Sequence, residues 1–227
     1  MRNPLRPLTL LLLPFVLAAC ASTRPASRDG GEREEEVTPG QMVMVVGDLP
    51  NLIFLGQSRR DAKLTMVAAG VPNYTSITAV TSLAPPPGLG YYSPRTGVEN
   101  NYARFTAYLY AYNLPADNDF HVILGDTPVF TPNVTKLINI EVSGRPDGAD
   151  VVFKAVRNQF LAKIGNPVAM AHGTYTCMAV PIALTVGGGP FWDVSHPNGG
   201  SGTSSCYGGT PVKTSNGWEL HPVTSVQ

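Results

Sequence analysis

The stretch Tyr-Ala-Arg-Phe-Thr-Ala-Tyr-Leu-Tyr-Ala-Tyr, residues 102–112, decides the fold. In it Phe105, Ala107 and Leu109 alternate with polar or aromatic residues, and this period of two predicts a half-buried β-strand. Apolar runs at 120–124 and 136–142 follow, and each is bounded by Gly, Pro or Asp. Three consecutive strands joined by turns are therefore expected to begin the folded domain.

The apolar pattern changes to a helical period between residues 147 and 165. Val152, Val156 and Phe160 lie four residues apart, as the buried face of an amphipathic helix requires. Runs at 180–186 and 218–226 predict two further strands, and the Gly-Gly-Gly-Pro stretch at 187–190 reads as a flexible turn.

The order β-β-β-α-β-β predicts a mainly β domain with one helix, an α+β protein, over residues 102–227. That order is the one used by an OB-like small barrel. An open antiparallel sheet with one helix packed on it has the same sequence signature and is the alternative. Residues 41–101 are expected to form an N-terminal extension wrapped on this domain, with a strand at 42–46, a short helix at 58–69 and strand-like alternation at 77–83.

Residues 1–19 have the features of a lipoprotein signal peptide. Arg2 and Arg6 precede an apolar run too short to remain as a membrane-spanning helix. The run ends in Leu-Ala-Ala-Cys, which resembles the bacterial lipobox, and the resemblance implies that the thiol of Cys20 carries a diacylglyceryl anchor (with palmitate as a typical acyl chain). A cleaved secreted protein with a chance cysteine is the alternative. We expect the protein to lie in the cell envelope, outside the cytoplasm, at the periplasmic face of the outer membrane.

Residues 20–40 are small, polar and charged, and they predict a flexible tether between the lipidated Cys20 and the folded part. The chain has 16 basic and 16 acidic residues, and its first forty residues hold five of each, so the body is also neutral. Proteins that bind phosphate backbones electrostatically usually show a basic excess, so nucleic acid is disfavoured as a partner. The expected partners are the membrane, through the lipid anchor, and another envelope protein or a cell-wall polymer.

Two cysteines remain once Cys20 is assigned to lipid. Cys177 and Cys206 would lie outside the cytoplasm, where disulfides persist, and neither belongs to a Cys-x-x-Cys pair. A disulfide bond between them is favoured over two free thiols or two metal ligands.

Short motifs in the C-terminal half resemble one recurring pattern. They are Asp119 to Leu124 with Asp126, then Ile140-Glu141, Phe191-Trp192-Asp193 with His196, and Trp218 to Val223. The pattern belongs to a family of uncharacterised bacterial extracytoplasmic domains, which read Asp-aromatic-His early and Glu-Leu-His-Pro-Val at the end. The resemblance covers residues 102–227, apart from a glycine- and serine-rich insertion between His196 and Trp218. It implies a shared fold and brings no assigned activity.

Histidines and carboxylates on the predicted strands are the candidate chemical groups. If they converge, they could act as metal ligands or general bases; they are His121, Asp193, His196, Glu219 and His221. No recognised ligand spacing links them, so the favoured interpretation is that each is a hydrogen-bonded structural residue. We therefore expect no catalytic residue, no metal and no cofactor.

Tyr108, Tyr110 and Tyr112 lie two apart on the first predicted strand and form a candidate binding face. Such a row could stack on bases or sugar rings, although cross-strand packing is the more frequent reason for one. The chain has no Gly-x-Ser-x-Gly, His-Glu-x-x-His or phosphate-binding Gly-Lys-Ser/Thr motif. The sequence thus favours a membrane-anchored envelope lipoprotein with a non-enzymatic binding or structural role. The alternative is a metal-assisted hydrolase.

Overall fold

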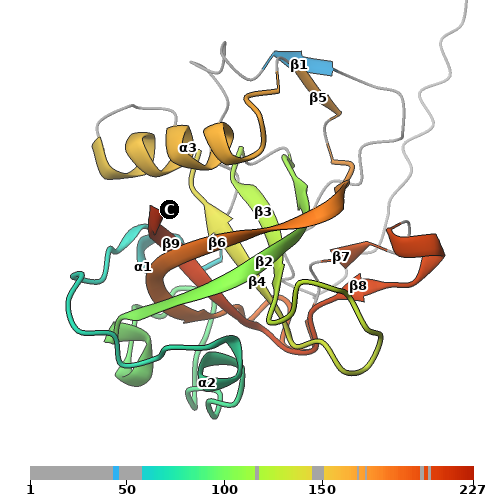
Figure 1. The fold of residues 1–227 in the computed structure, drawn as a ribbon. Coiled ribbons are helices and arrows are strands. Elements are labelled where there is room, and N and C mark those ends of the chain that lie inside the picture. The colour runs from blue at the N-terminus through green and yellow to red at the C-terminus, as the bar shows by residue number, and fades with distance from the viewer. Residues whose placement is uncertain are drawn as a thin grey trace, which may run out of the picture.

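Five strands form the centre of the molecule and account for the alternating runs of the sequence. The computed structural model describes residues 43–45, 58–115, 118–144, 151–167, 169–171, 173–199, 202–203 and 206–227. The central strands are β2 (Ala103–Asn113), β3 (Phe120–Gly125), β4 (Leu137–Val142), β6 (Thr176–Trp192) and β9 (Trp218–Val226). They close into a ring in the order β2-β3-β4-β9-β6, as Figure 1 shows. The fold is therefore mainly β with a few helices, and the closed ring contradicts the open-sheet alternative.

The strand pairing brings the middle of the chain beside its C-terminal strand. Neighbouring strands of the ring are antiparallel, except that β4 and β9 run parallel, with Asn139 opposite Glu219. On the other side of β4, Glu141 is opposite His121 of β3. Outward-facing polar residues of three adjacent strands are thereby placed next to one another.

The main core lies inside the ring, and its residues follow the strand period of two. β3 contributes Phe120, Val122 and Leu124, while β4 contributes Ile138 and Ile140. Because successive side chains of a strand point to opposite faces, the residues between these positions face outward.

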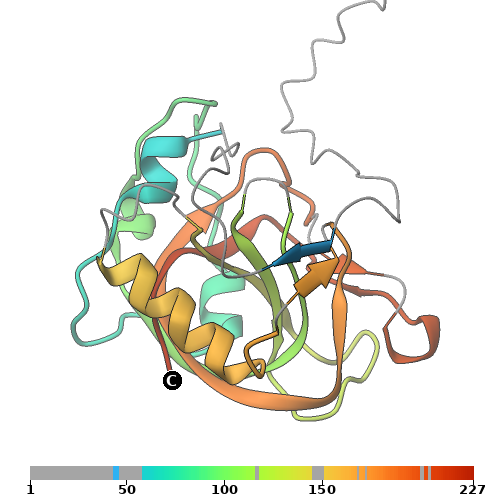
Figure 2. The ribbon, with the colours of Figure 1, turned by 90° about the horizontal axis from the view of Figure 1, so that it is seen from above.

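Helix α3 (Val151–Lys163) confirms the predicted helix and lies at one end of the ring, as Figure 2 shows. Its buried residues are Phe153, Val156 and Phe160, and the Phe160 ring packs 5.1 Å from the ring of Phe120. The predicted face is wrong at one position, because Val152 is 36% exposed and Phe153 takes its place in the core. Val152 and Phe153 both have a spacing to Val156 and Phe160 that fits one face of an α-helix. The sequence pattern alone therefore did not show which of the two is buried.

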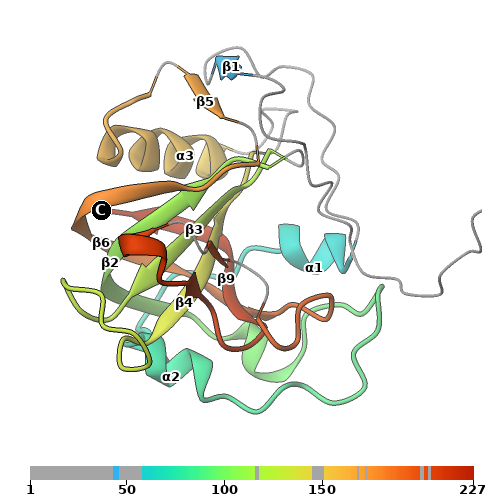
Figure 3. The ribbon, with the colours of Figure 1, turned by 90° about the vertical axis from the view of Figure 1, so that its right-hand side faces the viewer.

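Helix α2 (Ile77–Thr81) occupies the stretch whose alternation suggested a strand, so that prediction is wrong. The side chain of Ser76 accepts a hydrogen bond from the Ala79 backbone N–H at 3.1 Å, which caps the helix. Ile77 and Val80, three apart, are buried in the main core. Figures 1 and 3 show α2 and α3 at opposite ends of the ring.

The Gly-Gly-Gly-Pro stretch predicted as a flexible turn lies inside β6, which extends well beyond the predicted 180–186. A Cβ atom on Gly187 would lie 2.2 Å from the hydroxyl oxygen of Tyr102, and one on Gly188 would lie 2.6 Å from the carbonyl oxygen of Pro222. The pairing of β6 with β9 also shifts register here, as at a β-bulge. These glycines therefore allow close packing of the ring rather than flexibility.

The extension before the ring contributes helix α1 (Arg60–Leu64), within the helix predicted at 58–69, and the 3-10 helix η1 (Gly97–Asn100). Short pairs complete the structure: β1 (Val43–Val45) with β5 (Ala169–Ala171), and β7 (Gly202–Thr203) with β8 (Val212–Lys213), which flanks the 3-10 helix η2 (Tyr207–Gly209). The described residues thus hold three α-helices where the sequence predicted two.

The predicted signal peptide (1–19), Cys20 and the tether (20–40) lie outside the described residues. Among the helices that are described, none combines the length and the apolar character needed to cross a membrane.

Candidate functional site

A group of polar side chains lies on the outer face of β3, β4 and β9. It consists of Asp119, His121, Asn139, Glu141, Glu219 and His221, and we call it the polar cluster. His121, Asn139, Glu141 and Glu219 each lie between two residues of the main core, so strand alternation directs them to the other face. Asp119 directly precedes β3, and His221 follows the core residue Leu220 on β9. The structure therefore brings together His121, Glu219 and His221, three of the five residues that the sequence singled out.

His221 lies at the centre of the polar cluster. Its Nδ1 is 2.6 Å from Oε2 of Glu141 and 3.4 Å from Oε1 of Glu219, while its Nε2 is 3.7 Å from Oδ2 of Asp119. His121 approaches from the neighbouring strand, with its Nε2 3.5 Å from Oε1 of Glu141. An imidazole ring is thus surrounded by three carboxylates.

Asn139 and the loop after β4 fix the carboxylates in place. Asn139 Nδ2 donates hydrogen bonds to Oε2 of Glu219 at 3.0 Å and to Oε1 of Glu141 at 3.2 Å. Oδ1 of Asp119 accepts a hydrogen bond from the backbone N–H of Gly144 at 2.7 Å. The second oxygen of Asp119 is thereby turned toward His221.

The N-terminal extension covers the polar cluster. Lys63, on α1, places its Nζ 4.0 Å from Oε2 of Glu141 and 5.9 Å from the centre of the Phe191 ring. His221 is 0% exposed, and Lys63, Glu141 and Glu219 are 3%, 4% and 4% exposed. Figure 3 shows α1 beside β9. The cluster is closed from solvent.

Two buried arginines hold this cover against the ring. Arg59 donates to both carboxylate oxygens of Glu99 at 2.7 Å, and to the carbonyl oxygen of Trp192 on β6 at 2.9 Å. Arg95 donates to the carbonyl oxygen of Pro190 at 2.7 Å and to that of His221. Burial outweighs the nearby Glu99 carboxylate and lowers the pKa of Arg95 to about 10.

Burial and mutual proximity change the acid–base properties of the polar cluster. Burial alone would lower the pKa of His221, but the adjacent carboxylates, Glu141 first, outweigh it and raise that pKa to about 9. Burial raises the pKa of Glu219 to about 7, with a further contribution from the Glu141 charge. For Glu141, Lys63 and the two histidines overcome the effect of burial and hold the pKa well below the usual range of a carboxyl group.

Asp193 and His196, predicted to close the group, form a pair of their own at its edge. Nδ1 of His196 lies 2.5 Å from Oδ2 of Asp193, whose other oxygen accepts a hydrogen bond from the Ser195 backbone. Against the effect of burial, the hydrogen bond from His196 lowers the pKa of Asp193. A cavity of about 10 Å³, the volume of a single water, lies between this pair and Glu219.

The predicted tyrosine face is not a single exposed surface. The register of β2 shifts between Leu109 and Ala111, and this irregularity breaks the period of two that the prediction assumed. Tyr112 is 6% exposed and belongs to the main core, whereas Tyr110 is 0% exposed and packs in a second cluster outside the ring. Only Tyr108 is partly exposed among the three.

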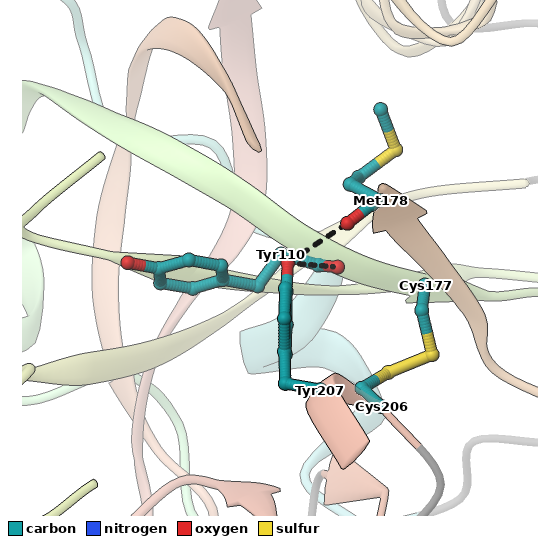
Figure 4. Close-up of a disulfide and its surroundings, with 5 residues drawn as sticks. All are labelled: Tyr110, Cys177, Met178, Cys206 and Tyr207. Atoms are coloured by element: carbon teal, nitrogen blue, oxygen red, sulfur yellow. Dashed lines mark hydrogen bonds between the residues drawn. A yellow bond between two sulfur atoms is a disulfide. The ribbon is translucent and has the colours of Figure 1, made fainter. Parts of the chain in front are cut away.

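The predicted disulfide between Cys177 and Cys206 is confirmed, with an S–S distance of 1.99 Å. Figure 4 shows it beside Tyr207, whose hydroxyl donates to the carbonyl oxygens of Met178 at 3.0 Å and Tyr110 at 3.3 Å. The bond joins β6 to the long connection that precedes β9.

An open groove lies between the β3–β4 loop and β8, on the side of the molecule that carries Tyr110 and Tyr207. Its volume is about 240 Å³, and Phe130, Leu137, Lys136 and Lys213 line it together with Thr and Ser side chains. Both lysines are exposed. Unlike the polar cluster, this surface is accessible to a ligand.

Four residues of the site were not singled out by the sequence analysis: Asp119, Asn139, Glu141 and Lys63. Glu141 and Asp119 appear in the family-like motifs but were not assigned a role, although the period of two around Ile140 could have placed Glu141 beside His121. Lys63 lies in the extension, whose apolar pattern is weak, and no feature of the sequence marks it.

Asp119, Glu141 and His221 are also the residues best placed to hold a metal ion. Each offers one ligand atom, and the three atoms lie within 4.8 Å of one another. No family model, curated protein or solved structure matches this chain. The resemblance of residues 102–227 to extracytoplasmic domains therefore stays a prediction, and the function has to be argued from this geometry.

Proposed function

We propose that the protein is a lipid-anchored lipoprotein of the bacterial envelope with a non-enzymatic binding or structural role, built on an OB-type barrel. The strand order supports the barrel assignment: a three-stranded meander, a helix, and two strands that return to close the ring through a parallel pairing of β4 with β9. Barrels of this type present loops and an outer sheet face to their ligands.

The anchor rests on the N-terminal sequence. The stretch at 17–20, after a short apolar run with two arginines before it, is what a lipidated Cys20 requires. One acyl-modified residue would hold the domain at the periplasmic face of the outer membrane without a spanning helix.

The closure of the polar cluster is the observation that carries the non-enzymatic role. A general base must come within hydrogen-bonding distance of the substrate proton, yet His221 is 0% exposed and lies beneath α1 and Phe191. Lys63 and the carboxylates instead attach the extension to the outer face of the ring. The cluster is a means of holding the cover in place.

The open groove is the surface on which binding would take place. Lys136 and Lys213 line the same groove as Phe130, a combination of positive charge and apolar surface that suits a carboxylate- or phosphate-bearing polymer or partner. Peptidoglycan, whose stem peptides carry carboxylates, fits this chemistry and the proposed location.

A metal-assisted hydrolase remains the second candidate, because His121, Glu219 and His221 do converge. It requires the cover to open during turnover. Hydrolytic activity of the wild-type chain that is lost in both His121→Ala and His221→Ala, with the fold retained, would favour it over the binding role.

Cell fractionation of the full chain tests the anchor. Cys20→Ser is expected to leave the membrane fraction or accumulate as an uncleaved precursor, while wild type stays with the membrane. A variant that matures and partitions like wild type would contradict the anchor.

Co-sedimentation of the detergent-solubilised full chain with purified peptidoglycan sacculi tests the groove. The double variant Lys136→Glu/Lys213→Glu should lose most of the binding, and the matched double variant Lys154→Glu/Lys163→Glu, on α3, should retain it. Equal loss in both would reveal a general charge effect rather than a site.

A further inference from the structure

The polar cluster has the donor atoms of a metal centre. One carboxylate oxygen each from Asp119 and Glu141 and a ring nitrogen of His221 lie within 4.8 Å of one another. Oε1 of Glu219 lies 3.4 Å from Nδ1 of His221, beside this group of three. Two ligands of a zinc ion, each bound at about 2.0–2.2 Å, must lie within roughly 4.4 Å of each other. The 4.8 Å limit on the spacing of the three donors is slightly wider than this.

Hydrogen bonding within the protein leaves buried atoms of His221, Glu141 and Glu219 unsatisfied. Neither ring nitrogen of His221 has a hydrogen-bond partner, and Oε2 of Glu141 and Oε1 of Glu219 also have none. Nδ1 of His221 and Oε2 of Glu141 are only 2.6 Å apart, but their contact lacks the angles of a hydrogen bond. Buried polar atoms nearly always find a partner, and a cation would provide one for the carboxylate oxygens and for one nitrogen of the His221 ring.

The charges of the polar cluster also favour a bound cation. Among the described residues, three carboxylates, from Asp119, Glu141 and Glu219, face the ammonium group of Lys63 and the imidazole rings of His121 and His221. The next charges outward, Arg95 and Asp193, are opposite in sign and offset each other. Metal binding requires the neutral form of His221. With that ring neutral, the three carboxylates and Lys63 leave an excess of two negative charges, which a divalent cation would neutralise.

We infer that Asp119, Glu141 and His221, with Glu219 beside them, bind a divalent metal ion of the zinc class in a closed, structural site. This inference goes beyond the proposed binding role and does not depend on it. Imidazole combined with carboxylates favours zinc or a similar transition metal over calcium and magnesium, which prefer oxygen ligands alone. Closed coordination without an open position is the mark of a structural zinc site.

Neighbouring groups are arranged to orient the ligands. Asn139 donates to both Glu141 and Glu219, and the Gly144 backbone donates to the oxygen of Asp119 that is turned away from His221. Such outer contacts fix the direction of metal ligands and typically contribute 10–100-fold to affinity. The ion would join β3, β4 and β9 and, through the Glu141–Lys63 contact, the cover formed by α1.

Elemental analysis of the full chain, purified in detergent without chelator, tests this inference. We expect near-stoichiometric zinc or a similar ion in wild type, and its loss in His221→Ala. Glu141→Gln is the second variant, because it keeps the shape of the side chain and so separates metal loss from failure to fold. His196→Ala, outside the proposed ligand set, should keep the metal. Circular dichroism should show a folded protein for every variant that is compared.

Addition of zinc to chelator-treated wild type should raise its melting temperature, and Glu141→Gln should show little or no such rise. Absence of metal after native purification, together with no thermal response to added zinc, would overturn the inference. So would metal retained in both His221→Ala and Glu141→Gln. Neither result would affect the fractionation and sacculus experiments, so failure of the metal site and failure of the proposed function remain distinguishable.

Discussion

Two surfaces on the outer face of the same strand, β4, differ in almost every property. Asn139 and Glu141 belong to the polar cluster, which is buried beneath α1, whereas Leu137, two residues earlier, borders the open groove. Charges in the cluster contact one another at 2.6–4.0 Å, while Lys136 and Lys213 at the groove are exposed. The comparison shows that the N-terminal extension, by covering part of the ring, determines which outward-facing polar residues are buried and which are accessible to a ligand.

The largest loss of stability is expected from a variant that detaches the N-terminal extension from the ring. Arg59→Ala leaves Glu99, 0% exposed, as a buried carboxylate without its guanidinium partner. Removal of one member of a buried ion pair costs about 3–5 kcal/mol of unfolding free energy. Urea denaturation of full chains will measure this. Arg104→Ala, at an exposed position, is the matched control and should change stability by no more than about 0.5 kcal/mol. A small effect for Arg59→Ala would mean that the cover is only loosely attached.

The disulfide belongs to the region of the molecule around the open groove. Cys177 and Cys206 are 29 residues apart in sequence, so the double variant Cys177→Ala/Cys206→Ala should lose about 3–4 kcal/mol by the loop-entropy model. The zinc content should be unchanged, because the bond lies outside the polar cluster. Loss of metal together with the disulfide would show that the two regions are coupled. Non-reducing mass spectrometry of the native protein should find the two cysteines linked.

Sequence reasoning succeeded where one period dominates. The strands from Ala103 to Val142 and the last strand, Trp218–Val226, follow apolar alternation, and the order around α3 was correct. Reasoning from the sequence was wrong at 187–190, because glycine indicates flexibility and close packing equally well. It was wrong at α2 because a short stretch such as 77–83 fits both periods.

The candidate site was predicted only in part, for a physical reason. His121, Glu219 and His221 alternate with core residues on their strands, so their shared face could be predicted. The cover could not, since Arg59 and Arg95 reach the ring through hydrogen bonds between residues 133 and 95 positions apart. Lys63 likewise approaches a residue distant in the sequence, with its Nζ 4.0 Å from Glu141. No local pattern encodes such a contact. The burial that makes the cluster structural was therefore invisible in the sequence.

A moderate pH effect is expected at the edge of the polar cluster. His196 lowers the pKa of Asp193 below its ordinary value of 3.8. A depressed carboxyl pKa contributes stability above the unfolded value, and that contribution is lost as the pH falls through the folded value. Wild type should therefore lose stability below about pH 4. His196→Ala should lose less stability over the same range, because it removes the hydrogen bond that lowers the pKa of Asp193. Thermal unfolding between pH 3 and 6 measures both, and identical curves would contradict the pairing.

The smallest effect on stability is expected at the groove. Lys213→Glu alters an exposed side chain, so its unfolding free energy should differ from wild type by no more than about 0.5 kcal/mol. Lys154→Glu, on the exposed face of α3, is the control. A loss of several kcal/mol in Lys213→Glu alone would show that the groove is a packed part of the structure rather than an open surface.

Chemical modification of the histidines tests most directly the claim that the polar cluster is closed. The side chains of His121, His196 and His221 are 7%, 29% and 0% exposed. Brief treatment of the folded full chain with diethylpyrocarbonate, followed by peptide mass spectrometry, should therefore modify His196 while His121 and His221 stay protected. Unfolding in urea should remove that protection, which controls for intrinsic reactivity. Modification of His221 as fast as His196 in the folded protein would contradict the account, because it would show a cluster open to solvent and to substrates.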